Sequence, residues 1–177
     1  MKFNKESLSY IQDKEHLYRV LHDGEIFSFT TPVMYIPFGV DQEYNKLICR
    51  LEFPEDSKMN TQYIHIRKII SKIEKYVCEK LNVQENELKS VIRKHSSFPD
   101  IIECHIKQCK NHIITKLEFE DKASNYLKTI YQIPDKSYGI AKIEWFGVFD
   151  YRNHEDCVDK THKVGIVLNI SSLYIKK

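Results

Sequence analysis

The stretch 141-AKIEWFGVFDYR-152 has the character of a β-strand, because β-branched and aromatic side chains alternate along it with polar ones. A second stretch of this kind, 163-KVGIVLNISSLYI-175, follows the polar segment 153–162. Two such stretches separated by a polar loop are typical of a β-hairpin. The sequence therefore predicts a terminal hairpin rich in aromatic residues.

Strand patterns also occur earlier in the chain. Residues 24–40 are β-branched and aromatic, and their prolines restrict them to a sheet edge or to strand ends. Residues 46–53 alternate apolar and polar side chains, as a half-buried strand does. Residues 101–107 and 112–119 alternate in the same way and are joined by a short polar segment, which predicts a second hairpin.

One long amphipathic helix is predicted after the turn at 54–60. Its apolar residues recur every three or four positions over about five turns: Tyr63, Ile66, Ile70, Ile73, Val77 and Leu81. A second, shorter helix is predicted at about 85–94, with Leu88, Val91 and Ile92 facing inward. The polar and weakly periodic residues 1–22 predict an N-terminal arm or a short helix.

Together these elements predict a mainly β or α+β fold. The expected architecture is a small β-barrel or sandwich of about six strands, with one long capping helix and one short helix. No Gly/Ser-rich linker, repeat or low-complexity tract divides the 177 residues. Residues 23–177 are therefore predicted to form a single domain behind the arm.

Composition narrows the functional classes. The 27 basic and 25 acidic side chains give a net charge of +2, which neither demonstrates nor excludes nucleic-acid binding, because a basic face can coexist with an acidic one. No apolar run reaches the roughly 20 residues of a membrane-spanning helix. The first residues lack the apolar core of a secretory signal, so we expect an intracellular protein. Five scattered cysteines argue against a disulfide framework.

The aromatic strand at 141–152 is the main candidate for a binding surface. Trp145, Phe149 and Tyr151 are predicted to share one face and Phe146 to lie on the other. Exposed rings on a barrel stack on unpaired bases, while nearby cations contact phosphates. The cations close enough in sequence are Lys142, Arg152 and Lys163. A core strand with a buried tryptophan fits the same pattern, and both interpretations stay open.

No metal site or cofactor is predicted. Cys104, His105, Cys109 and His112 lie within nine residues, but the first two would point to opposite faces of a strand. Because no Cys-x-x-Cys pair is present and Cys104 is in phase with apolar neighbours, the segment favours a core strand over a zinc site. No phosphate-binding glycine loop or nucleophile motif occurs either.

One enzymatic pattern needs consideration. Asp100, Glu120 and Lys122 follow the order of carboxylates and lysine in metal-dependent nucleases of the restriction-enzyme type. Residues of these types are common, and Glu120 and Lys122 fall in a polar turn at a strand end. A solvated charged turn is therefore the simpler interpretation.

The segments 35-YIPFGV-40, 46-KLICRLEF-53 and the closing pair around Trp145 and 163–173 resemble a family of small proteins from nucleocytoplasmic large DNA viruses. That family is similar in organisation to the single-stranded DNA-binding proteins of short-tailed phages. The resemblance implies an OB-like barrel that binds single-stranded DNA during viral replication, recombination or repair, without catalysis.

The resemblance also implies roles for individual residues. Phe38 would neighbour the binding groove, while Trp145, Phe149 and Tyr151 would stack on bases and the three cations named above would contact phosphates. It implies an infected host cell as the location and viral replication proteins as partners. An OB barrel places its helix between the third and fourth strands, whereas the helix predicted here follows two clear strands.

Two other functions remain alternatives. A virion structural or assembly protein, held by protein contacts, fits the near-neutral charge and an arm at 1–22 that wraps a second copy or another virion protein. A metal-dependent nuclease is the third candidate. Single-stranded DNA binding is the leading prediction.

Overall fold

A computed structural model of the chain describes residues 4–14, 16–43, 46–109, 112–120, 130, 133–152 and 163–176. At its centre, five strands form a closed ring in the order β4-β6-β9-β14-β13 and back to β4. These strands are β4 (Met34–Ile36), β6 (Lys46–Glu52), β9 (Ile101–Ile106), β13 (Ser137–Asp150) and β14 (Val164–Lys176). Because β9 and β14 run parallel and the other neighbours antiparallel, the ring is a mixed β-barrel. The mainly β barrel predicted from the sequence is confirmed.

Short strands extend this barrel at its edges. They are β1 (Leu8–Lys14), β2 (Leu17–His22), β3 (Ser28–Thr30), β5 (Val40–Glu43), β7 (Leu88–Lys89), β8 (Ile92–Arg93) and β12 (Lys116–Phe119). A separate two-stranded ribbon pairs β10 (Gln108–Cys109) with β11 (His112–Ile113). The described strands thus outnumber the six that were predicted.

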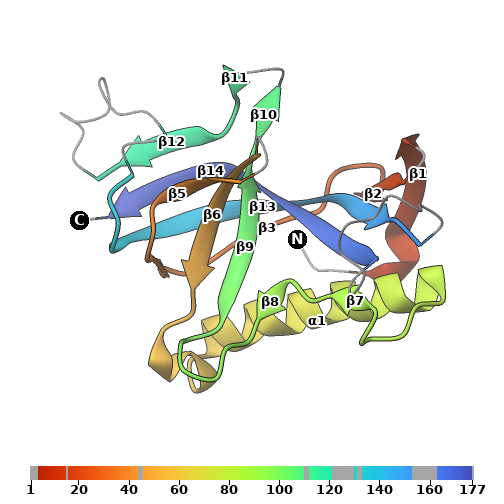
Figure 1. Ribbon diagram of the computed structural model, residues 1–177, viewed down its shortest axis with the longest axis horizontal. Coiled ribbons are helices and arrows are strands. Elements are labelled where there is room, and N and C mark those ends of the chain that lie inside the picture. Colours follow the sequence, from red (N-terminus) through yellow and green to blue (C-terminus); the bar gives the residue numbers. More distant parts are fainter. Residues whose placement is uncertain are drawn as a thin grey trace.

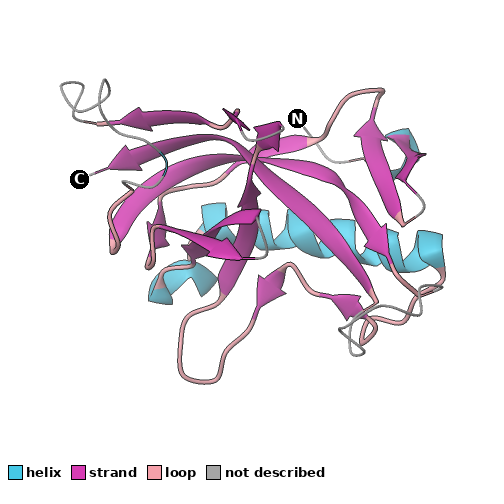
Figure 2. Ribbon diagram, turned by 45° about the horizontal axis from the view of Figure 1, so that its top comes forward, coloured by secondary structure: helices cyan, strands magenta, loops and turns pink. Residues whose placement is uncertain are grey.

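One long helix, α1 (Thr61–Leu81), lies along one side of the barrel (Figures 1 and 2). The Asn60 side chain caps its first turn by accepting a hydrogen bond from the Gln62 N–H, and Asn82 ends it in the left-handed conformation. The predicted stripe packs against the barrel, with Tyr63 donating to the carbonyl of Val33. The long helix is confirmed. In the chain it follows the second ring strand, β6, and precedes the third, β9. Two short 3₁₀ helices, at Lys5–Ser7 and Glu55–Lys58, complete the helical segments that the structure describes.

The terminal hairpin is also confirmed, and both of its strands belong to the barrel ring. β13 and β14 pair antiparallel from Tyr138 with Lys176 to Asp150 with Val164. The register shifts twice, and the second shift, between Trp145 and Gly147, is a bulge that leaves Phe146 without a partner on β14. Because a bulge adds one residue to one strand, it reverses which side chains face the core beyond it.

Three sequence predictions are corrected by the pairing of strands. Residues 8–22 form the β1–β2 hairpin, and β2 joins β13, so this segment is part of the sheet and not an arm or a helix. The predicted helix at 85–94 contains β7 and β8, which pair with β14 and β9. The predicted hairpin of 101–107 with 112–119 forms at its tip, where β10 pairs with β11, but β9 and β12 each pair with β14 instead of with each other.

Candidate nucleic-acid interface

Two adjoining hollows of about 420 and 230 Å³ form a groove on the outside of the barrel. They share four lining residues, Lys46, His105, Tyr151 and Val167. The first hollow extends over His16, Lys107 and Phe146, and the second over Phe149, Lys89 and Arg93. We refer to the two hollows together as the groove.

Aromatic side chains line one wall of the groove. Phe146 faces outward because it follows the buried Trp145 on the strand, and the bulge then brings Phe149 to the same side. The ring of Phe149 lies over its cross-strand partner Gly165, where a Cβ atom would come within 2.3 Å of the ring. Tyr151 follows, with its ring 5.3 Å from that of Phe149 and stacked at 4.6 Å on His16. The three rings are half-exposed, and the guanidinium of Arg19 lies 5.4 Å from the centre of the Phe146 ring.

Two lysines of the groove lining lie near His105. Among the described residues, no carboxylate forms an ion pair with Lys46 or Lys89, although both line the groove. Burial, together with the positive charges of these two lysines, lowers the pKa of His105 to about 4. His105 is therefore neutral at pH 7, and the groove centre carries a positive potential suited to an anion.

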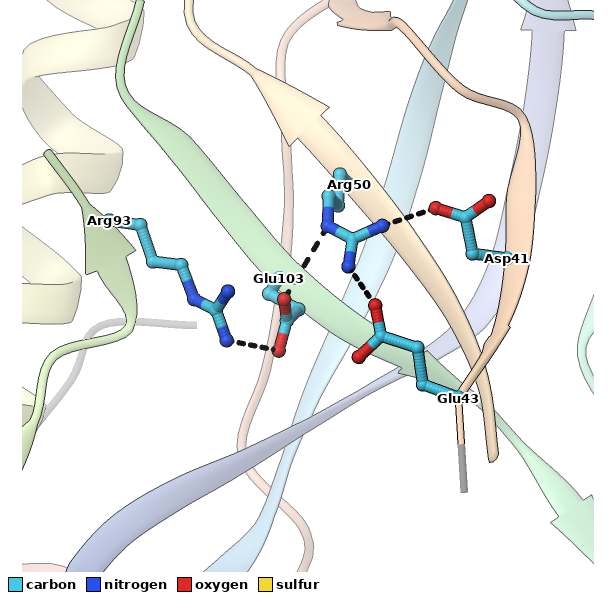
Figure 3. Close-up of polar contacts among 5 residues, drawn as sticks. All are labelled: Asp41, Glu43, Arg50, Arg93 and Glu103. Atoms are coloured by element: carbon cyan, nitrogen blue, oxygen red, sulfur yellow. Dashed lines mark hydrogen bonds and ion pairs between the residues drawn. The ribbon is translucent and has the colours of Figure 1, made fainter. Parts of the chain in front are cut away.

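The two cations at the ends of the groove are already paired. The Nζ atom of Lys107 lies 2.8 Å from a carboxylate oxygen of Glu144, and Nη2 of Arg93 lies 2.8 Å from Glu103. Glu103 also faces Arg50, whose guanidinium donates to both Asp41 and Glu43 of β5 (Figure 3). This charged cluster ties β5, β6, β9 and β8 together beside the groove.

The predicted stacking residues divide into two groups. Phe149 and Tyr151 line the groove, but Trp145 is 0% exposed, and its indole N–H donates to the Gly147 carbonyl. The prediction that Trp145 stacks on bases is therefore corrected, because the barrel interior covers the ring. Phe38 is 59% exposed in the connection between β4 and β5 and is not among the residues that line the groove.

The predicted phosphate contacts lie outside the groove lining or hold a partner. Arg152 is paired with Asp150 at 2.8 Å, and although burial raises the pKa of Asp150, hydrogen bonds from Arg152 lower it overall. Lys163 is exposed, and its carbonyl accepts a hydrogen bond from the Tyr151 N–H, which places it beside the groove. Lys142 pairs across the sheet with Thr30 and Ser172, away from the groove lining.

Sequence reasoning missed several lining residues. Phe146 was predicted to face away from the other aromatic residues, and Lys46, Lys89, Lys107, His105 and His16 were not considered as binding residues. An isolated glycine inside a strand pattern signals a bulge, so Gly147 was the one sequence feature that could have indicated that Phe149 lies on the same side as Phe146.

The residues considered for metal binding are not gathered into one site within the described residues. The described residues hold no group of three His, Cys, Asp or Glu side chains that could bind a metal ion. Cys104 is buried in the core, and Cys109 and His112 pair across the β10–β11 ribbon. Asp100 precedes β9 and pairs with Arg67 of α1, whereas Glu120 follows β12 and its N–H donates to the Ile175 carbonyl of β14, so the two carboxylates are held by different elements. Lys122 lies outside the described residues.

No protein-family model matches the chain, and no curated protein matches it either. Among solved structures, the chain is similar to gp2.5, a single-stranded DNA-binding protein encoded by bacteriophage T7, with a TM-score of 0.54. The alignment covers 86% of this chain and 87% of that chain at 10% sequence identity. The fold is OB-like. At this identity the similarity concerns the fold alone.

The OB-like fold gives the groove a defined position. OB folds bind oligonucleotides on the face of strands 2 and 3 and with the loops that follow strands 1 and 4. Here the groove takes Lys46 from the start of the second ring strand, His105 from the third, and Tyr151 from the beginning of the connection after the fourth.

As for membranes, no helix in the described part of the chain is long and apolar enough to span one.

Proposed function

We propose that the chain binds single-stranded DNA in the groove and does so without catalysis. The observation that carries this proposal is the joint presence of half-exposed rings and two lysines without a described acidic partner in one groove. Stacking on a ring stabilises a bound base by about 1–3 kcal/mol, and lysines neutralise the phosphates between bases. The similarity in fold to a phage single-stranded DNA-binding protein supports the proposal.

A single strand suits this groove better than a duplex. Stacking on Phe146, Phe149 and Tyr151 requires bases whose faces are open, and bases in a duplex are stacked on one another. The contacts are rings and lysine ammonium groups, which do not read base edges, so we expect weak sequence preference. Replication, recombination or repair of a large viral genome in an infected cell is the biological setting that we propose.

Lysine substitutions in the groove test this function. We expect wild-type protein to bind fluorescein-labelled oligo-dT at low salt, with a linear fall of log K against log salt concentration. Replacing both central lysines (Lys46→Gln with Lys89→Gln) should reduce the magnitude of the slope by about 1.4, since each phosphate contact contributes about 0.7 for single strands. The control (Lys58→Gln with Lys68→Gln) removes the same charge from exposed positions outside the groove. Equal effects of the two double variants would contradict the proposal.

The two alternative functions have weaker support. The β1–β2 hairpin belongs to the main sheet, so the free arm on which the assembly hypothesis relied is not present in residues 8–22. The separated carboxylates remove the basis for a nuclease centre. Self-association stays a prediction, which size-exclusion chromatography with light scattering would test.

A further inference from the structure

The charged cluster beside the groove suggests how one of its cations becomes available to DNA. Arg93 lines the groove, but its guanidinium is paired with Glu103 in the structure. A phosphate that enters this end of the groove therefore competes with a resident carboxylate. The outcome depends on what happens to Glu103 when Arg93 leaves it.

Glu103 has a second cationic partner. Its other carboxylate oxygen lies 3.5 Å from Nε of Arg50, and Figure 3 shows the carboxylate between the two guanidinium groups. The side chain of Glu103 is 15% exposed, whereas that of Arg93 is 42% exposed. The carboxylate is thus anchored, and the arginine is the partner with freedom to move. If Arg93 turns to a phosphate, Glu103 stays within ion-pair distance of Arg50, which it shares with Asp41 and Glu43.

The carboxylate paired with Lys107 has no such second cationic partner among the described residues. Glu144 is also 15% exposed, and Lys107 is the one cation within ion-pair distance of it among the described residues. Moving Lys107 to a phosphate would leave a largely buried carboxylate without its partner, which is costly. Lys107 should therefore stay on Glu144.

We propose, on the basis of the function proposed above, that Arg93 exchanges its ion pair with Glu103 for a phosphate of the bound strand, and that Arg50 permits this exchange by keeping Glu103 compensated. Lys107 remains paired. The groove then uses three cations for phosphates, Lys46, Lys89 and Arg93. Glu103 sets the affinity, because binding must first release Arg93 from it.

A double-mutant cycle tests the exchange with oligo-dT as the probe. Glu103→Gln should tighten binding by about two- to fivefold, which corresponds to the strength of an exposed ion pair. In the Arg93→Gln background the same substitution should have no effect, because there is no arginine to release. Arg93→Gln alone should reduce the salt slope by about 0.7, and Lys107→Gln should change it by less than half of that.

The outcomes separate this inference from the proposed function. If Glu103→Gln tightens binding equally with and without Arg93, removal of a negative charge acts through the general field and the exchange is wrong. An unchanged salt slope in Arg93→Gln would also overturn it, while leaving the groove as the binding site. No binding of oligo-dT by the wild-type protein would remove the proposed function and the exchange together.

Discussion

Trp145 and Phe146 are consecutive on β13 and therefore face opposite sides of the barrel wall. Trp145 is buried against the core and Phe146 lines the groove. The ring of Tyr76 on α1 meets Trp145 edge-on at 6.4 Å, so the tryptophan belongs to the packing between helix and barrel. Trp145 is the single tryptophan of the chain, which makes this relationship measurable by fluorescence.

We expect oligo-dT to bind without strong quenching of Trp145 emission. Quenching by a base requires contact with the indole face, and the barrel interior covers that face. Anisotropy of labelled DNA and protein fluorescence, measured in the same titration, check this. Quenching that parallels the rise in anisotropy would show that the strand reaches Trp145, which contradicts the described packing.

Phe146→Ala should weaken oligo-dT binding by about 1–3 kcal/mol, since it removes one stacking ring from the groove. Its effect on the free energy of unfolding should be smaller, because the ring is half-exposed. Phe98→Ala is the matched control: Phe98 is exposed in the connection between β8 and β9 and does not line the groove. Anisotropy titrations of both variants provide the comparison. A loss of affinity in Phe98→Ala as large as in Phe146→Ala would count against the groove.

Arg50→Gln should destabilise the protein by about 2 kcal/mol and lower Tm by about 4–8 °C. The substitution leaves the carboxylates of Asp41, Glu43 and Glu103 close together without the guanidinium that joins them. Arg93→Gln, in the same cluster but more exposed, should cost less than about 1 kcal/mol. Thermal unfolding followed by circular dichroism would measure both. The interpretation of Arg50 as the centre of the cluster is wrong if the two variants lose equal stability.

The protein should lose stability between about pH 6.5 and pH 4 because of His105. Its pKa is about 4 in the folded protein and 6.5 in the unfolded chain, so the unfolded chain binds the proton first as the pH falls. This linkage costs about 2 kcal/mol at pH 5 and nothing above pH 7. Between pH 7 and pH 5, the Tm of the His105→Gln variant should therefore fall by less than the Tm of the wild type. Parallel falls in Tm would mean that His105 is not held neutral.

Local patterns predicted the elements whose partners are near in sequence or whose periodicity is strong. The stripe from Tyr63 to Val77 was sufficient for α1, and alternation on both sides of 153–162 was sufficient for the pairing of β13 with β14. The helix predicted at 85–94 was wrong. Leu88 and Val91 are three positions apart, which is also the spacing of residues on one face of a helix. Pairing with β14 and β9, and a hydrogen bond from the Val91 N–H to Glu74 of α1, hold them extended.

The candidate site was less predictable because it is assembled by topology. Lys46, Lys89 and His105 are brought together by pairings across the barrel, which single-sequence periodicity does not contain. The bulge beside Gly147 reversed the facing of the aromatic residues, so Phe146 and not Trp145 lies with Phe149. The net charge of +2 left a basic face open, and the structure places Lys46 and Lys89 in the lining of one groove.

We propose that single-stranded DNA lies in the groove, to which β6, β7, β9, β13 and β14 contribute lining residues, and the contact itself can be located on the protein. Ultraviolet cross-linking of oligo-dT to the wild-type protein, followed by mass spectrometry of the linked peptides, would do so. We expect cross-links at Phe146, Phe149 or Tyr151. Cross-links confined to other surfaces, such as the exposed ring of Phe38, would contradict binding in the groove.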